Sequence, residues 1–166
     1  MLDSARGRSP VPDESDEPRV HLAIGSRFEN IELVQVVLED ALEGMGVDGD
    51  TRHWVGLAVR EAVANAIKHG NRQDPGKQVE VDWGVEGHEL VVHVRDEGEG
   101  FDPDHLGSPL APENLLRPNG RGIFYMKSFM DTIDYAPGPT GGTEVTLRKR
   151  VAGRPAEALG IPQEGQ

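Results

Sequence analysis

Cysteine is absent from this sequence of 166 residues, and aromatic residues make up only 5% of it. Without cysteine the chain forms no disulfide and no thiolate metal site, as is usual in a reducing compartment. No apolar run approaches the roughly 20 residues that a membrane-spanning helix needs, so we expect no membrane partner. Residues 1–19 have no apolar segment of the signal-peptide kind. Together these absences predict a cytoplasmic protein.

Basic side chains are also scarce, with 17 Lys and Arg against 29 Asp and Glu and a formal net charge of −12. Nucleic-acid binding usually requires a positive surface, so the balance argues against a direct nucleic-acid partner. An acidic chain that binds an anion must gather its few cations locally. Five cations lie near the motifs described below: Lys68, Arg72, Lys77, Arg121 and Lys127.

The composition divides the chain into one domain and two tails. Residues 1–19 are rich in Pro, Ser, Arg and acidic residues and have little to bury, which predicts a disordered acidic tail. Residues 151–166 are interrupted by Pro and Gly, which predicts a flexible C-terminal tail. The remaining 20–150 are long enough for one domain with a real core.

Hydrophobic periodicity places two helices in the first half of this domain. A short strand is expected at 20–24, followed by a helix along the apolar stripe of 31–42. A second helix is expected to run from a cap at Asp50 or Thr51 to about Gly70. Apolar residues nearly encircle this second helix, so we expect it to be buried.

The second half reads as two hairpins separated by a long loop and a helix. The expected elements are strands at 79–85 and 90–95, a proline-rich loop at 101–119 that could act as a lid, a helix at about 120–130, and strands at 132–135 and 143–150. The predicted fold class is α+β: a two-layer sandwich of a roughly five-stranded mixed or antiparallel sheet, with three helices on one face.

Glu61 and Asn65 interrupt the apolar surface of the second helix and lie on one side of it. A buried carboxylate without compensation costs several kcal/mol, so Glu61 needs a reason to be there. Mg²⁺ prefers oxygen ligands and keeps most of its waters, so the Asn65 amide with phosphate oxygens is a plausible set of ligands. Glu61 could then serve as a general base. Alternatively, both residues lie on a solvent-facing edge.

Asp96 closes the strand at 90–95 and is followed by Gly98 and Gly100. A carboxylate at a strand end can accept a hydrogen bond from the exocyclic amine of adenine, a contact that guanine cannot mirror. The two glycines let the backbone approach a ligand closely. The alternative is an ordinary acidic turn.

Gly120, Arg121 and Gly122 open the third helix. Free N–H groups at a helix start form an anion site, and Arg121 adds charge. Alone, this pair of glycines is equally consistent with a loop end. The three motifs together occur in the order and on the elements that their chemistry requires. We therefore expect ATP and its magnesium ion to lie between the second and third helices.

The remaining candidates are less specific. The six histidines show no paired metal spacing, although His69 borders the expected pocket and could contact phosphate. Trp54 and Trp83 are expected to be core residues rather than binding anchors.

These three motifs make the sequence resemble the ATPase superfamily of DNA gyrase, sensor histidine kinases and MutL, which share the Bergerat ATP-binding fold. The segment from Glu61 to Asn71, the segment 95–103 and the segment 120–126 are most similar to the small bacterial anti-sigma factors that are also serine protein kinases. The resemblance covers about 20–150.

The resemblance implies a role for each motif residue. Asn65 would hold Mg²⁺, Glu61 would be the catalytic base, and Asp96 would read adenine. The residues expected around the phosphates, under the lid at 101–119, are Gly98, Gly100, Gly120, Arg121 and Gly122. Thr143, at the start of the last strand, would add a hydrogen bond near the base.

The resemblance also implies partners. Members of this family sequester a sigma factor and phosphorylate a serine of a small anti-anti-sigma protein of the STAS class, and many are homodimers. The alternative is a non-catalytic, ATP-gated regulatory binding module, because related domains can keep these motifs after losing kinase activity.

Overall fold

The computed structural model describes residues 19–100 and 126–152. Its centre is a five-stranded sheet in the order β1-β2-β3-β5-β4, and every neighbouring pair is antiparallel. The strands are β1 (Val20–Gly25), β2 (Gln78–Glu86), β3 (Glu89–Arg95), β4 (Thr132–Pro137) and β5 (Thr143–Arg150). Two hairpins, β2–β3 and β4–β5, therefore join through the β3–β5 pairing in the middle of the sheet.

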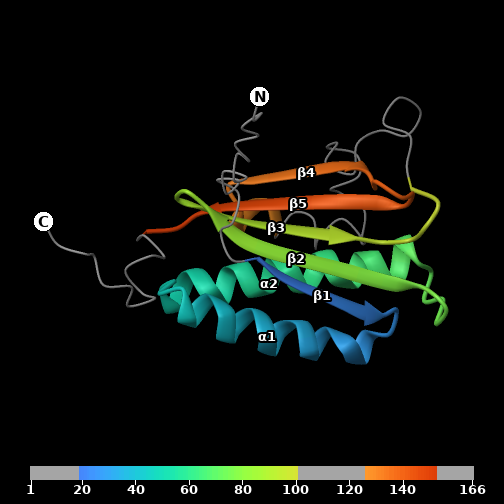
Figure 1. Cartoon of the computed structure of the whole chain (residues 1–166), viewed down its shortest axis with the longest axis horizontal. Helices are drawn as coiled ribbons and strands as arrows, with labels where there is room; N and C mark the ends of the chain where they lie inside the picture. Colours follow the sequence, from blue (N-terminus) through green and yellow to red (C-terminus); the bar gives the residue numbers. More distant parts are fainter. Residues whose placement is uncertain (1–18, 101–125, 153–166) are drawn as a thin grey trace, which may run out of the picture.

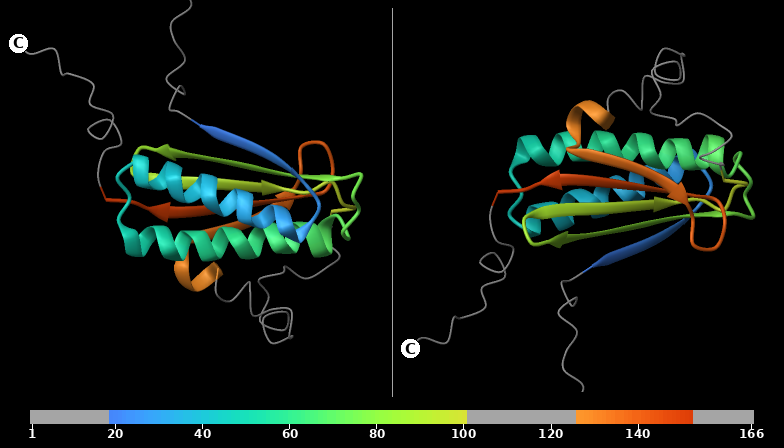
Figure 2. Two further views of the ribbon diagram at one scale, coloured as in Figure 1. Left: turned by 90° about the horizontal axis from the view of Figure 1, so that it is seen from below. Right: turned by 90° about the horizontal axis from the view of Figure 1, so that it is seen from above.

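Two long helices, α1 (Ile31–Gly44) and α2 (Gly49–Asn65), pack side by side on one face of this sheet (Figure 1). The one-turn helix η1 (Phe28–Asn30) precedes α1, and the π-helical turn η2 (Ala66–Gly70) extends α2. A short helical stretch at residues 126–129 lies beside α2 in both views of Figure 2. The result is the two-layer α+β sandwich that the periodicity predicts, and the sheet is antiparallel rather than mixed.

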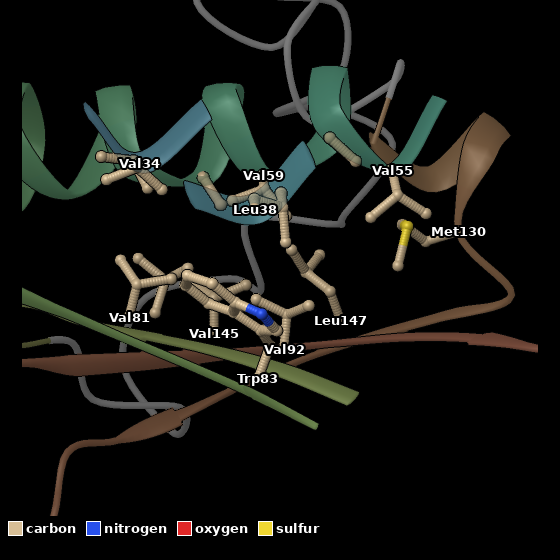
Figure 3. Packing of buried hydrophobic residues seen from close by; sticks show 14 of the residues in the cluster. Val34, Leu38, Val55, Val59, Val81, Trp83, Val92, Met130, Val145 and Leu147 are labelled. Atoms are coloured by element: carbon tan, nitrogen blue, oxygen red, sulfur yellow. The ribbon is translucent and has the colours of Figure 1, made fainter. Parts of the chain in front are cut away.

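The core lies between the helices and the sheet (Figure 3). Val34 and Leu38 of α1 and Val59 of α2 face Trp83 and Leu147 of the sheet, and all five are at most 1% exposed. Along most of β2 and β3 inward apolar residues alternate with outward polar ones, as expected for a sheet covered on one face, although Val91 is also buried. This packing fixes the position of α2 relative to the ends of β3 and β5.

Two expectations about α2 are wrong. Its cap is Asp48, whose carboxylate accepts a 2.9 Å hydrogen bond from the Thr51 N–H, rather than Asp50 or Thr51. The helix is also not buried all round, because Trp54 is 41% exposed and Leu57 is 37% exposed. Trp54 is therefore not a core residue. Its ring stacks on Phe129 of the short helical stretch, with the centroids 4.3 Å apart.

Val151 still packs on the core, and its N–H donates to the His88 carbonyl. Apart from Arg19, Val151 and Ala152, the tails predicted at 1–19 and 151–166 lie outside the described residues and stay predictions. Within 19–100 and 126–152, no helix combines the length and the apolar character needed to cross a bilayer.

Candidate functional site

Asp96 lies directly after β3, where the ends of three elements meet. Its own N–H donates to the Thr143 carbonyl, and the Thr143 N–H donates back to Asp96 Oδ1 at 3.1 Å. The Gly98 N–H donates to the same Oδ1 at 2.9 Å. Asp96 is only 8% exposed, so two backbone donors and the start of β5 hold a nearly buried carboxylate in one orientation.

Oδ2, the second carboxylate oxygen of Asp96, lies against the end of the α2–η2 helix. A methyl carbon added at Gly70 would lie 2.3 Å from both Oδ2 and Cγ of Asp96. No hydrogen bond reaches Oδ2 from the part of the chain that the structure describes. One oxygen of this carboxylate is thus saturated by the backbone, while the other is an acceptor available to a ligand.

Glycine is required at several positions around Asp96. A methyl carbon at Gly98 would lie 2.1 Å from the Gly70 carbonyl oxygen, and one at Gly142 would lie 2.1 Å from the Asp96 carbonyl oxygen. Gly100 and Gly142 also have positive φ angles, of 75° and 70°. The backbone of three segments therefore converges on Asp96 more closely than any side chain would permit.

Burial raises the pKa of Asp96 above its ordinary value of 3.8. The Gly98 and Thr143 N–H groups and the positive charge of Lys77 oppose this shift. A carboxylate that is costly to ionise in the free protein gains more from a hydrogen-bond donor placed on it than an exposed carboxylate would. The site is thus suited to a ligand that presents an N–H group.

Glu61 and Asn65 lie one turn apart on α2, and both are half-buried. Neither side chain makes a hydrogen bond or an ion pair within residues 19–100 and 126–152. Asn65 precedes Gly70 by five residues, which would be about 7.5 Å along a regular α-helix. Gly70 lies against Asp96, so the end of the α2–η2 helix, which carries Asn65, meets the residue that follows β3. The ends of α2 and β3 lie at the same end of the sandwich (Figure 1).

Of the other predicted site residues, some lie near Asp96 and others lie outside the described residues. His69 is exposed beside Gly70, and Thr143 contributes backbone rather than hydroxyl contacts to Asp96. Gly120, Arg121 and Gly122, together with the loop at 101–119, lie outside the described residues. Of the five cations expected nearby, Lys77 acts on Asp96, while Arg72 lies 3.3 Å from Glu99 in an exposed ion pair.

A magnesium ion could be held here only with help from its ligand. Within the described ranges no cluster of three or more His, Cys, Asp or Glu side chains could hold a metal ion. Mg²⁺ does not need such a cluster, since it is commonly bound by one or two protein oxygens plus phosphates and waters. The unpaired Asn65 amide fits that role.

Asn71 is a polar residue that the motifs did not single out. It is 1% exposed, and its amide contacts Ser26, Gln78 and Glu97, which belong to three different segments. The sequence carries only a weak signal for it, a polar residue at the end of an apolar helix. Glu97 lies 26 residues further on and Ser26 lies 45 residues before it, so only the fold reveals the contacts.

The model of the histidine kinase-like ATPase domain family matches residues 24–149 of the chain, which covers nearly all described elements. The chain therefore belongs to this family.

Its curated relatives place it more narrowly, among the anti-sigma factors and serine-protein kinases of that family. The anti-sigma F factor of Oceanobacillus iheyensis is 30% identical over 135 residues, covering 79% of this chain and 91% of the relative. The anti-sigma F factor of Geobacillus kaustophilus is 32% identical over 137 residues, with 80% and 92% covered. The serine-protein kinase RsbW of Bacillus subtilis is 28% identical over 120 residues, with 69% and 75% covered.

Solved structures share the fold. The RsbU and RsbW domains of Rv1364c from Mycobacterium tuberculosis match with a TM-score of 0.60 at 20% identity, over 81% of this chain. The chain spans about a third (32%) of that longer protein. The mycobacterial sensor histidine kinase MprB matches with a TM-score of 0.50 at 20% identity, covering 80% of this chain and 98% of that one. At these identities the likeness concerns the fold alone.

Proposed function

We propose that this protein is an ATP-dependent serine protein kinase and anti-sigma factor that acts in the cytoplasm, as a homodimer. It would sequester a sigma factor and phosphorylate a STAS-type anti-anti-sigma protein. The observation that carries the proposal is the half-satisfied Asp96 carboxylate, with Oδ1 held by the backbone and Oδ2 open. The relatives named anti-sigma F factor and serine-protein kinase RsbW support the partners and the reaction.

In this proposal each described residue has one task. Asp96 Oδ2 accepts a hydrogen bond from the exocyclic amine of adenine, and Lys77 adds positive charge nearby. Asn65 supplies an amide oxygen to magnesium, which when bound neutralises phosphate charge during transfer. Glu61, one turn away on α2, accepts the proton of the attacking serine hydroxyl as its oxygen bonds to the γ-phosphorus and ADP leaves.

Six further residues complete the proposed site, and three of them, Gly120, Arg121 and Gly122, lie beyond the described ranges. Gly120, Arg121 and Gly122 would line the phosphates at the start of the third helix, under the lid at 101–119, and His69 would contact phosphate from the end of η2. Gly98 and Gly100 would bring the backbone close to the nucleotide.

The decisive experiment incubates the purified protein with ATP, Mg²⁺ and its STAS partner, and locates phosphoserine by mass spectrometry. Glu61→Ala should abolish transfer while ATP binding and sigma-factor binding persist. Glu43→Ala, an exposed glutamate on α1, is the matched control and should transfer at the wild-type rate. Partner regulation that survives in Glu61→Ala, with no phosphoserine formed by the wild type, would instead identify an ATP-gated binding module.

A further inference from the structure

A closed ring of hydrogen bonds ties the end of the α2–η2 helix to the residue that follows Asp96. Asn71 Oδ1 accepts the Glu97 N–H at 2.7 Å, and the Glu97 carboxylate accepts the Gln78 N–H at 2.5 Å. The Gln78 carbonyl then accepts from Asn71 Nδ2 at 2.8 Å, which closes the ring. Nδ2 also donates to the Ser26 hydroxyl at 2.9 Å, a branch outside the ring.

The backbone around Asn71 is distorted so that this amide points inward. The helix widens to a π turn over Ala66–Gly70, where the Asn71 N–H donates to the Ala66 carbonyl five residues earlier. Arg72 and Gln73 then adopt positive φ angles of 52° and 57°, although neither is glycine. Left-handed backbone at two consecutive side-chain-bearing residues is costly and persists only where surrounding contacts require it. π turns are likewise frequent at functional sites.

The ring constrains the residue that follows Asp96, whereas Thr143 constrains Asp96 itself. Thr143 fixes the Asp96 N–H and Oδ1, while the ring fixes the Glu97 peptide N–H and side chain. The same amide sets where the helix that carries Asn65 ends. Asn71 therefore fixes the distance between the two proposed nucleotide contacts, which are the Asp96 carboxylate and the Asn65 amide.

From this geometry we infer that Asn71, with Glu97 as its ring partner, is a positioning residue for nucleotide binding and for the choice of adenine over guanine. The inference rests on the proposed function, since it concerns the same ATP site. Neither residue contacts the nucleotide; both act through Asp96. Loss of the ring should let the Asp96 carboxylate turn, which weakens ATP binding and reduces discrimination against GTP.

The test measures dissociation constants for ATP and GTP by calorimetry, with melting temperatures, on full-length protein. Glu97→Ala changes an exposed residue and removes the hydrogen bond from the Gln78 N–H to the Glu97 carboxylate. It should weaken ATP binding about 3- to 10-fold and reduce the preference for ATP over GTP. Asn71→Ala should do so by about 10-fold or more. Glu97→Gln keeps an acceptor oxygen and should restore most of the affinity.

Ser26→Ala is the matched control, because it deletes the buried branch but leaves the ring closed. It should lower the melting temperature while the ATP affinity stays within about twofold of wild type. Should Asn71→Ala not fold, the Glu97 variants alone decide the outcome. ATP should also slow amide exchange at Glu97 of the wild type together with Gly98 and Thr143.

Two results overturn the inference alone: ATP and GTP binding unchanged in Glu97→Ala, or an equal loss in Ser26→Ala, which would indicate general destabilisation. The inference is also overturned if ATP slows amide exchange at Gly98 and Thr143 but leaves the exchange rate at Glu97 unchanged. Failure of the wild type to bind ATP overturns the proposed function and the inference together.

Discussion

One methyl group at residue 70 should disable the Asp96 site without straining the backbone. Gly70 does not have a positive φ angle, so alanine is conformationally allowed there. The methyl carbon of an alanine at position 70, however, would lie 2.3 Å from Cγ and Oδ2 of Asp96, whereas an ordinary contact is 3.4–4 Å long. Gly70→Ala therefore forces the carboxylate to retreat by roughly 1 Å, away from the position that a nucleotide base would meet.

The size of the effect follows from the hydrogen bonds at stake. A shift of that size cannot keep the bonds from the Gly98 and Thr143 N–H groups to Oδ1, which are 2.9 and 3.1 Å long. A hydrogen bond to a charged group contributes about 1.5–3 kcal/mol. If the ligand loses one such bond at Oδ2, the affinity for ATP should fall roughly 10- to 100-fold.

The assay is calorimetric titration of ATP with Mg²⁺ into wild type, Gly70→Ala and a matched control. Gly44→Ala is that control, since nothing lies within 4 Å of a methyl carbon added at the end of α1. It should bind ATP as the wild type does and hold or raise the melting temperature, because alanine favours helix over glycine. A folded Gly70→Ala protein whose ATP affinity is within twofold of wild type would falsify the assignment of Asp96.

Four further outcomes are expected. Asp96→Asn should weaken ATP binding by roughly 10- to 100-fold but spare GTP, because it replaces one acceptor with a donor. Burial raises the pKa of Asp96, so its carboxyl group favours folding below pH 3.8, and this contribution to stability is lost as pH rises through the folded-state pKa. Asp96→Asn should therefore raise the melting temperature of the nucleotide-free protein at pH 7 and have less effect on it near pH 3.8. Burial lowers the pKa of His93 below 6.5, so wild-type stability should fall as pH drops from 6.5 through the folded-state pKa, and His93→Gln should reduce that fall. A double-mutant cycle of Trp54→Ala and Phe129→Leu should give a coupling energy of about 0.5–1.5 kcal/mol in urea denaturation.

The His93 prediction has a control variant, and two of the others have a result that would contradict them. His88→Gln, at an exposed turn residue, should leave the pH dependence of the melting temperature as it is in the wild type. GTP binding weakened as much as ATP binding in Asp96→Asn would show that the carboxylate does not read the base. A coupling energy of zero for Trp54 and Phe129 would mean that their stacking adds nothing to stability.

Local pattern predicted most of the secondary structure. Alternation of Val and polar residues identified β2 and β3, and the apolar stripe identified α1, because a single buried face imposes its period on the residues. The expected caps of α2 lie two and three residues after the observed one, since Asp48, Asp50 and Thr51 have similar capping chemistry and only the chain path selects among them. Trp54 was misjudged because hydrophobicity does not specify on which side of a helix the sheet lies.

The residue types themselves determined the candidate chemistry: a carboxylate and an amide four residues apart on a helix, and an acid followed by glycines at a strand end. Only the tertiary structure decided how these parts meet. It placed Gly70 against Asp96, closed the ring through Asn71 and Glu97, and left one carboxylate oxygen of Asp96 open. The Gly70–Asp96 and Asn71–Glu97 contacts each join residues 26 apart, and the Thr143–Asp96 hydrogen bond joins residues 47 apart. Their geometry depends on how the helices pack on the sheet, which no local sequence pattern encodes.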